Sequence, residues 1–167
     1  MLGLMQSQPL LISSLIEFAE RHHGDAEIVS RRVEGDIHRY TYRDLAARAR
    51  RLANALDDLK LQFSDRVATL AWNGYRHMEL YFGVSGSGRV LHTVNPRLHP
   101  DQIAWIVNHA EDQVLCFDTT FLPLVQAVHA KCPTVRNWVA LCDPDTLPAY
   151  PGLPGLTSYD AWISPQS

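Results

Sequence analysis

The sequence has few cysteines and no long apolar run. Its three cysteines, Cys116, Cys132 and Cys142, are odd in number and none stands in a C-x-x-C pair, so neither a disulfide framework nor a zinc site is indicated. The apolar stretch at residues 10–16 is interrupted by two serines and follows no basic region, so no signal peptide is indicated. No stretch approaches the roughly 20 apolar residues that cross a bilayer. We therefore expect a cytoplasmic protein without a transmembrane segment.

Lysine is scarce, with two examples among 167 residues. A phosphate-binding loop needs backbone N–H groups exposed by glycines, and normally a lysine that meets the phosphate charge. Lys60 follows a predicted helix without a neighbouring glycine, and Lys131 precedes Cys132-Pro133. Because neither lysine lies in such a loop, we expect that this chain binds no cofactor by itself.

The sequence also lacks an excess of positive charge. The formal net charge is -3, so no overall positive field attracts nucleic acid or anionic lipid, and we expect no nucleic-acid partner. The eight histidines show neither H-x-x-x-H nor H-E-x-x-H spacing, which predicts no metal site. Serine, histidine and aspartate are all present, but no local signature of a catalytic triad is found, and we predict no catalytic residue.

Three glycines, Gly83, Gly86 and Gly88, form a G-x-x-G-x-G cluster between a predicted helix and a predicted strand. A dinucleotide-binding fingerprint needs G-x-G-x-x-G leading from a strand into a helix, so both the order and the topology differ. A G-x-S-x-G nucleophile elbow fails at its last position, which is Ser87. We interpret the cluster as small residues that let the end of the helix pack closely against the sheet.

The composition, 46% hydrophobic and 20% charged, is that of a globular protein, and a chain of this length buries about two-thirds of its unfolded surface. In its first third, Thr41 and Asp44 have the spacing of a capping box before an apolar helical stripe. Helical and strand periodicities predict the following order: helix 10–23, hairpin strands 27–33 and 37–41, and a long helix after Thr41.

From residue 66 onward, short β-rich runs alternate with helical patterns. The predicted strands are 67–72, 89–94, 113–117 and 137–141, and the predicted helices are 75–87, 100–110 and 120–131. Strands separated by helices imply right-handed crossovers and a parallel sheet. We therefore predict an α/β fold: a mainly parallel sheet flanked by helices and preceded by a helix and a β-hairpin.

Ligands of a parallel sheet lie beyond the carboxyl ends of its strands. Asn73 follows the first predicted parallel strand, Asn95 and Arg97 follow the second, and Asp118 follows the third. Asn73, Asn95 and Arg97 are therefore candidate cleft-facing binding residues. Turn chemistry is the alternative interpretation, because Asn73-Gly74 and Asn95-Pro96 are ordinary turn signals.

The end of the sequence is rich in proline and glycine, which predicts a linker or loop with a short helical turn at residues 159–163. We place an α/β subdomain at residues 1–143 and a linker at residues 144–167, and we expect the remainder of a larger domain to follow. Five of the ten prolines lie in this linker: Pro144, Pro148, Pro151, Pro154 and Pro165.

Ordered motifs from about residue 10 to residue 163 resemble the AMP-forming, or adenylate-forming, acyl-CoA synthetases. Thr41-Tyr42-Arg43-Asp44-Leu45 is similar to the T-Y-x-E-L segment of that family, and Asp65-Arg66-Val67-Ala68 resembles its G-D-R-V-A segment. Residues 72–98 and 106–112 resemble the medium- and long-chain fatty-acyl-CoA ligase branch. Departures at residues 85–87 and at His99 are variations in packing or capping.

The resemblance implies the N-terminal subdomain of a fatty-acid-CoA ligase, which converts ATP, a fatty acid and CoA to acyl-CoA, AMP and diphosphate through an acyl-adenylate, with Mg²⁺. The family's phosphate loop, adenine site and catalytic lysine come later than residue 167, so we expect the chain alone to be inactive. The implied partners are the remainder of the ligase chain and, in a homodimer, a second copy. Two alternatives stay open: a self-sufficient binding or dimerisation module, and a flavodoxin-like nucleotide-binding domain suggested by fold analogy.

Overall fold

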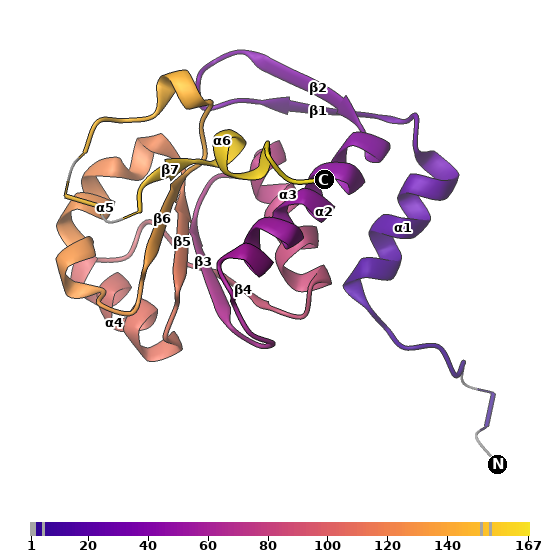
Figure 1. Ribbon diagram of the computed structural model, residues 1–167, viewed down its shortest axis with the longest axis horizontal. Helices are drawn as coiled ribbons and strands as arrows, with labels where there is room; N and C mark the ends of the chain where they lie inside the picture. Colours follow the sequence, from indigo (N-terminus) through magenta and orange to yellow (C-terminus); the bar gives the residue numbers. More distant parts are fainter. Residues whose placement is uncertain (1–2, 5, 151, 154) are drawn as a thin grey trace.

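The computed structural model describes residues 3–4, 6–150, 152–153 and 155–167. A helix, α1 (Ile12–His23), and a hairpin of β1 (Glu27–Arg31) and β2 (Ile37–Thr41) precede a layered α/β unit (Figure 1). That unit consists of α2 (Tyr42–Asp58), β3 (Arg66–Leu70), α3 (Tyr75–Gly86), β4 (Val90–Thr93), α4 (Pro100–Ala110), β5 (Val114–Phe117), α5 (Leu122–Val128), β6 (Asn137–Ala140), β7 (Thr157–Ser158) and α6 (Tyr159–Ile163).

The sheet is parallel throughout, with the strand order β4-β3-β5-β6-β7. The first strand along the chain, β3, lies between the second and the third, so the direction of winding reverses there. Because crossovers are right-handed, this reversal puts α3 on one face of the sheet and α4 and α5 on the other. The predicted α/β fold with a parallel sheet is confirmed.

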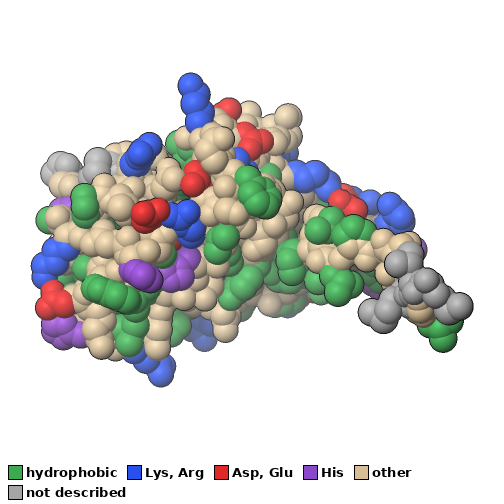
Figure 2. All heavy atoms as spheres, turned by 90° about the horizontal axis from the view of Figure 1, so that it is seen from below, with side chains coloured by type: hydrophobic (Ala, Val, Ile, Leu, Met, Phe, Trp, Pro, Cys, Tyr) green, Lys and Arg blue, Asp and Glu red, His purple; other side chains and the backbone are tan. Residues whose placement is uncertain are grey.

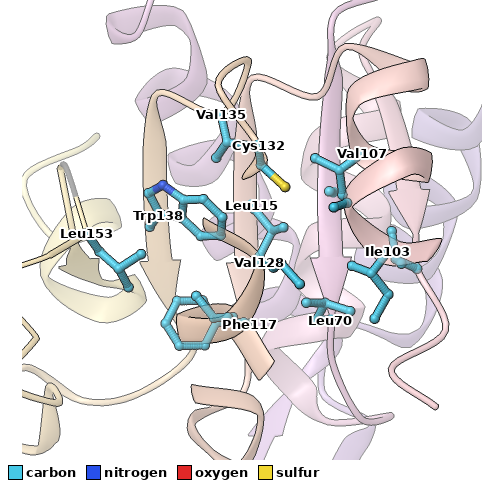
Figure 3. Packing of buried hydrophobic residues seen from close by; sticks show 14 of the residues in the cluster. Leu70, Ile103, Val107, Leu115, Phe117, Val128, Cys132, Val135, Trp138 and Leu153 are labelled. Carbon is cyan, nitrogen blue, oxygen red and sulfur yellow. The ribbon is translucent and has the colours of Figure 1, made fainter. Parts of the chain in front are cut away.

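Both faces of the sheet are covered, so the central strand β5 is buried at all four positions. On one face, Leu115 and Phe117 pack with Trp138 of β6 against α4 and α5 (Figure 3). On the other face, Val114 and Cys116 pack against the apolar sides of α2, α3 and α6. Residues that alternate along one strand thus supply both halves of the core.

The start of α2 follows the predicted capping box. The Thr41 hydroxyl accepts a hydrogen bond from the Asp44 backbone N–H, and the Asp44 carboxylate accepts one from the Thr41 backbone N–H. The helix predicted at residues 120–131 is divided in the structure. Short 3-10 turns, η1 (Thr119–Phe121) and η2 (His129–Lys131), flank α5. Pro123 lies in the first turn of α5, where its missing N–H leaves no helical hydrogen bond unmade.

The glycine cluster allows close packing at Gly83, but the neighbour is a helix and not the predicted sheet. A Cβ on Gly83 would lie 2.7 Å from Leu52 Cδ2 and 2.9 Å from the Ala49 carbonyl oxygen, both on α2. Gly88 has a φ of +79°, which favours glycine, and it turns the chain into β4. The cluster therefore shapes the packing of α2 on α3.

The second half of the predicted linker is packed into the fold. Residues 157–158 form β7, which pairs with β6, and the predicted helical turn at residues 159–163 is present as α6. Tyr159 and Ile163 are buried because they fill the face of the sheet beside α2. Pro151 and Pro154 lie outside the described residues. The boundary at residue 143 stays a prediction, but the sheet continues beyond it.

Candidate functional site at the carboxyl edge of the sheet

The reversal of strand order places a topological switch point between the carboxyl ends of β3 and β5, where open α/β sheets bind ligands. Trp72 follows β3 and Asp118 follows β5. Asp118 Oδ2 accepts a hydrogen bond of 2.6 Å from the Trp72 backbone N–H, which joins the two strand ends. Burial raises the pKa of Asp118 to about 6, against the opposing effect of that hydrogen bond. A buried carboxyl group therefore lies at the switch point.

His77, in the first turn of α3, contacts both β3 and the loop that follows it. Its Nδ1 lies 3.1 Å from the Trp72 carbonyl oxygen, and its Nε2 lies 3.1 Å from the Thr69 hydroxyl. Burial lowers the pKa of His77, which favours the neutral ring. Since a carbonyl only accepts, Nδ1 carries the proton and Nε2 accepts from Thr69. His77 is a structural anchor in this arrangement, with both ring nitrogens engaged.

The β1–β2 hairpin lies across this carboxyl edge (Figure 1). Ser30 Oγ accepts a hydrogen bond of 3.1 Å from the Tyr75 backbone N–H, at the start of α3. Arg32 Nη2 lies 2.7 Å from Asp143 Oδ2, beyond the end of β6. These contacts leave a recess of about 40 Å³ beneath the hairpin, far below the 300 Å³ or more of typical ligand pockets.

Arg76 is the buried centre of a partly exposed ionic network at this edge. Its guanidinium is 2.9 Å from Glu34 of the hairpin, 2.6 Å from Asp143 and 2.8 Å from Asp160 of α6. It also donates to the Leu141 carbonyl oxygen at 3.0 Å, and the residue is 5% exposed. One side chain therefore connects the hairpin, the end of β6 and α6 to helix α3.

A second arginine extends the network along α2. Arg48 lies 2.8 Å from Glu79 of α3 and 2.6 Å from Asp160. Glu79 is fully buried, and burial raises its pKa against the lowering effect of Arg48, while the Tyr159 hydroxyl donates to it at 2.9 Å. Sequence reasoning did not identify these residues as a cluster. The available signal was the pair of charged residues, Arg76 and Glu79, within the apolar pattern of α3.

The predicted site residues lie in two separate places. Asn73 lines the recess at the switch point and a neighbouring apolar groove. Asn95 and Arg97 are exposed beyond β4, and Asn95 Oδ1 accepts a hydrogen bond of 3.0 Å from the Arg97 backbone N–H. That contact forms the turn proposed as the alternative interpretation. The three residues are all beyond carboxyl ends of parallel strands, and their binding role stays a prediction.

Neither lysine of the chain lies in a phosphate-binding loop. Lys60 follows α2 with a φ of +58°, and Lys131 Nζ is paired with Asp101 Oδ1 at 2.6 Å. Across residues 3–4, 6–150, 152–153 and 155–167, no three histidine, cysteine, aspartate or glutamate side chains gather as a metal site. No helix in the described part of the chain is both long and apolar enough to cross a membrane. We therefore derive no chemical step from this edge.

The parallel sheet, its hairpin and its preceding helix form a fold that is shared with the N-terminal part of solved acyl-CoA ligases. The sequence profile described as AMP-binding enzyme matches residues 15–162, and the chain belongs to that family. Anthranilate CoA ligase AuaEII, solved in complex with anthranoyl-AMP, superposes with a TM-score of 0.76 at 21% identity, over 97% of this chain and 30% of that chain. That likeness shows the shared fold.

Two curated relatives are CoA ligases. A 3-methylmercaptopropionyl-CoA ligase from Ruegeria lacuscaerulensis is 51% identical over 98% of this chain and 30% of its own length. A medium-chain-fatty-acid–CoA ligase from Ectopseudomonas oleovorans is 44% identical over the same shares. The predicted resemblance to acyl-CoA ligases is confirmed. The chain spans about 30% of the length of these relatives.

Proposed function

We propose that this chain is the N-terminal part of an AMP-forming acyl-CoA ligase, and that alone it is a framework without adenylation activity. The family match over residues 15–162 carries the first half of the proposal. The second half is supported by the two lysines, neither of which lies in a phosphate loop, and by the hairpin that fills the switch point. In the whole ligase, ATP, Mg²⁺, CoA and a carboxylic acid would be the ligands.

The test is acid-dependent exchange of labelled pyrophosphate into ATP, measured on the purified 167-residue chain. We expect exchange at the background rate, because neither lysine lies in a phosphate loop and the described residues contain no cluster of metal ligands, so transition-state charge on the phosphates is not stabilised. A full-length relative serves as the positive control. Exchange above background with the chain alone would contradict the framework proposal.

Two candidates are proposed for the carboxylic acid that the whole ligase activates. A medium- or long-chain fatty acid is suggested by the motifs at residues 72–98 and 106–112, whereas the relative with 51% identity carries the name of a 3-methylmercaptopropionyl-CoA ligase. Assaying the whole ligase with decanoate and with 3-methylmercaptopropionate separates the two. A preference of tenfold or more in kcat/KM for one acid decides the substrate class.

We also propose a cytoplasmic location and a homodimer of the ligase. Three unpaired, buried cysteines support a reducing compartment. For the dimer, the support is the exposed apolar stripe of α1, in which Leu11, Leu15 and Phe18 are each more than half exposed. Light scattering of the whole ligase tests the dimer, and a monomeric mass at micromolar concentration would contradict it.

A further inference from the structure

The inner face of the β1–β2 hairpin lies on Tyr75, the first residue of α3. His38 of β2 stacks on the Tyr75 ring, with the ring centroids 3.7 Å apart and the planes inclined by 15°. Ser30, which pairs with His38 across the hairpin, accepts the Tyr75 backbone N–H at 3.1 Å. Tyr40, two positions after His38, meets the same ring edge to face at 5.7 Å. These contacts join both strands of the hairpin to the start of α3.

The imidazole of His38 brings an unsatisfied polar atom to this contact. Its Nε2 is buried and has no hydrogen-bond partner within the described part of the chain. A neutral imidazole leaves one ring nitrogen without a proton, whereas both nitrogens of an imidazolium carry one. Protonation of His38 would therefore bury a charged N–H group without an acceptor, which is less favourable than burying an unpaired neutral nitrogen.

The charges around His38 also disfavour a proton there. Arginines of the hairpin, α2 and α3 act on it: Arg32, Arg48 and Arg76. The guanidinium carbons of Arg76 and Arg48 lie 4.8 Å and 5.7 Å from the Tyr75 ring centroid, so that ring already faces two cations. Each carboxylate of the same network is paired with one of these arginines at 2.6–2.9 Å: Glu34, Glu79, Asp143 and Asp160. A charged His38 would therefore add a cation where the carboxylates already have partners.

The direction of the pH dependence follows from these surroundings. Burial lowers the pKa of His38, and the three arginines lower it further, while Asp160 opposes them. Because a solvated histidine has a pKa of about 6.5, the closed hairpin loses stability as pH falls through that value. Burial raises the pKa of Tyr40 and Tyr75, so both stay neutral. Asp118 acts in the opposite direction, because burial at the same recess raises its pKa to about 6.

We propose that His38 is a proton sensor that holds the hairpin closed over the switch point when neutral and releases it when a proton from solvent adds to Nε2. Release separates β1 and β2 from Tyr75 and uncovers Asn73 and Asp118, which line the recess beneath the hairpin. This inference goes beyond the proposed ligase function and does not depend on it. Pyrophosphate exchange tests the chemistry and amide exchange tests the hairpin, so the two proposals can fail separately.

The experiment is amide hydrogen exchange at pH 7.5 and pH 5.5, corrected for the intrinsic effect of pH on exchange. It uses the 167-residue chain with Asp118→Asn, which removes the opposing titration. We expect opening of β1 and β2 to increase by up to about tenfold at the lower pH, as a solvated pKa of about 6.5 implies. The buried strand β5 reports global unfolding and should keep its protection. Equal losses in the hairpin and in β5 would overturn the proposal.

Matched variants assign the effect to one histidine. His38→Phe keeps a ring on Tyr75 but takes up no proton, so the protection of the hairpin should no longer depend on pH. Other histidines lie at the molecular surface, where several are visible in Figure 2, and they titrate as well. His22→Gln removes one of them from α1 and should keep the full pH dependence. The same pH dependence in His38→Phe as in its parent would overturn the role of His38.

Two further measurements decide the proposal even if His38→Phe does not fold. In an NMR titration of the unaltered chain, the His38 ring should titrate below pH 6.5, and a midpoint at or above 6.5 would overturn the proposal. Glu34→Gln removes the ion pair with Arg76 and should increase hairpin opening by a similar factor at both pH values. If Glu34→Gln instead abolishes the pH dependence, the proton acceptor is that carboxylate and the proposal is wrong.

Discussion

At Gly83, a single hydrogen in place of a methyl group sets how closely α2 approaches α3. An alanine Cβ there would lie 2.7 Å from Leu52 Cδ2 and 2.9 Å from the Ala49 carbonyl oxygen, and the backbone oxygen cannot move aside cheaply. We predict that Gly83→Ala lowers the free energy of unfolding by about 1–3 kcal/mol in urea titration. Gly86→Ala is the control, since its Cβ would meet nothing closer than 3.8 Å, and it should be neutral or stabilising by up to about 1 kcal/mol. Equal losses in both would contradict the packing argument.

Asp118 makes stability depend on pH in a defined direction. Its pKa in the folded protein is about 6, above the value of about 3.9 in an unfolded chain, so between these values the folded state binds more protons and stability falls as pH rises. Asp118→Asn keeps an oxygen for the Trp72 N–H without the buried charge. We predict that it raises the free energy of unfolding by about 1–3 kcal/mol at pH 7.

At pH 4 the carboxyl group is neutral in the folded protein and about half ionised in the unfolded chain, so the advantage of Asp118→Asn should shrink there to less than about 1 kcal/mol. Denaturant titrations at pH 7 and pH 4 measure the difference. If Asp118→Asn raised the free energy of unfolding equally at both pH values, burial of the Asp118 charge would not be the cause.

Arg76 neutralises three carboxylates on three different elements. We predict that Arg76→Met destabilises the protein by about 3 kcal/mol, because three partly buried carboxylates then lose a buried partner, although Arg32 and Arg48 still contact Asp143 and Asp160. Arg39→Met removes an exposed ion pair with Glu27 from the same hairpin and should cost less than about 1 kcal/mol. Thermal unfolding of both variants provides the comparison, and similar costs would refute a special role for Arg76.

Elements with local signals were predictable from the sequence, and long-range pairings were not. The capping box at Thr41 and the apolar stripe of α2 depend on residues three or four positions apart, and both are present as predicted. The ionic network joins Arg76 to Asp160, 84 positions away, and no periodicity reports such a contact. The proline-rich composition after residue 143 likewise concealed β7, because pairing with β6 outweighs local propensity over so short a strand, whereas α6 was predicted as a helical turn at residues 159–163.

The last two elements provide a direct test of the predicted linker. A chain that ends after Leu156 loses β7 and α6, exposes the face that Tyr159 and Ile163 cover, and leaves Arg48 without Asp160. We predict that it no longer unfolds cooperatively. A chain that ends after Ser164 retains both elements and should unfold like the intact protein. Calorimetry distinguishes these outcomes. If the two shortened chains showed the same unfolding transition, a linker beginning at residue 144 would be supported.

At the scale of the whole molecule, the sheet has the winding of a flavodoxin-like domain, yet the hairpin changes what that winding can bind. The strand order around β3, β4 and β5 is the order that creates a ligand crevice at the switch point. Here β1 and β2 lie over that edge. Two ion pairs hold the hairpin in place: Arg32 with Asp143, and Glu34 with Arg76. The hairpin therefore occupies most of the space in which the sheet topology alone predicts a ligand.

This arrangement predicts that the 167-residue chain binds neither ATP nor CoA. The recess of about 40 Å³ is too small for a nucleotide, and opening it would break several partly buried ion pairs at once. Calorimetric titration with ATP and Mg²⁺, and separately with CoA, should give only heats of dilution up to millimolar concentration. The same titrations on Glu34→Gln, which loosens the hairpin, separate a steric block from a missing binding group. Restored binding would show that the hairpin alone excludes the nucleotide, whereas continued absence would place the phosphate contacts outside this chain. Saturable binding by the unaltered chain would contradict the prediction and revive the nucleotide-binding alternative.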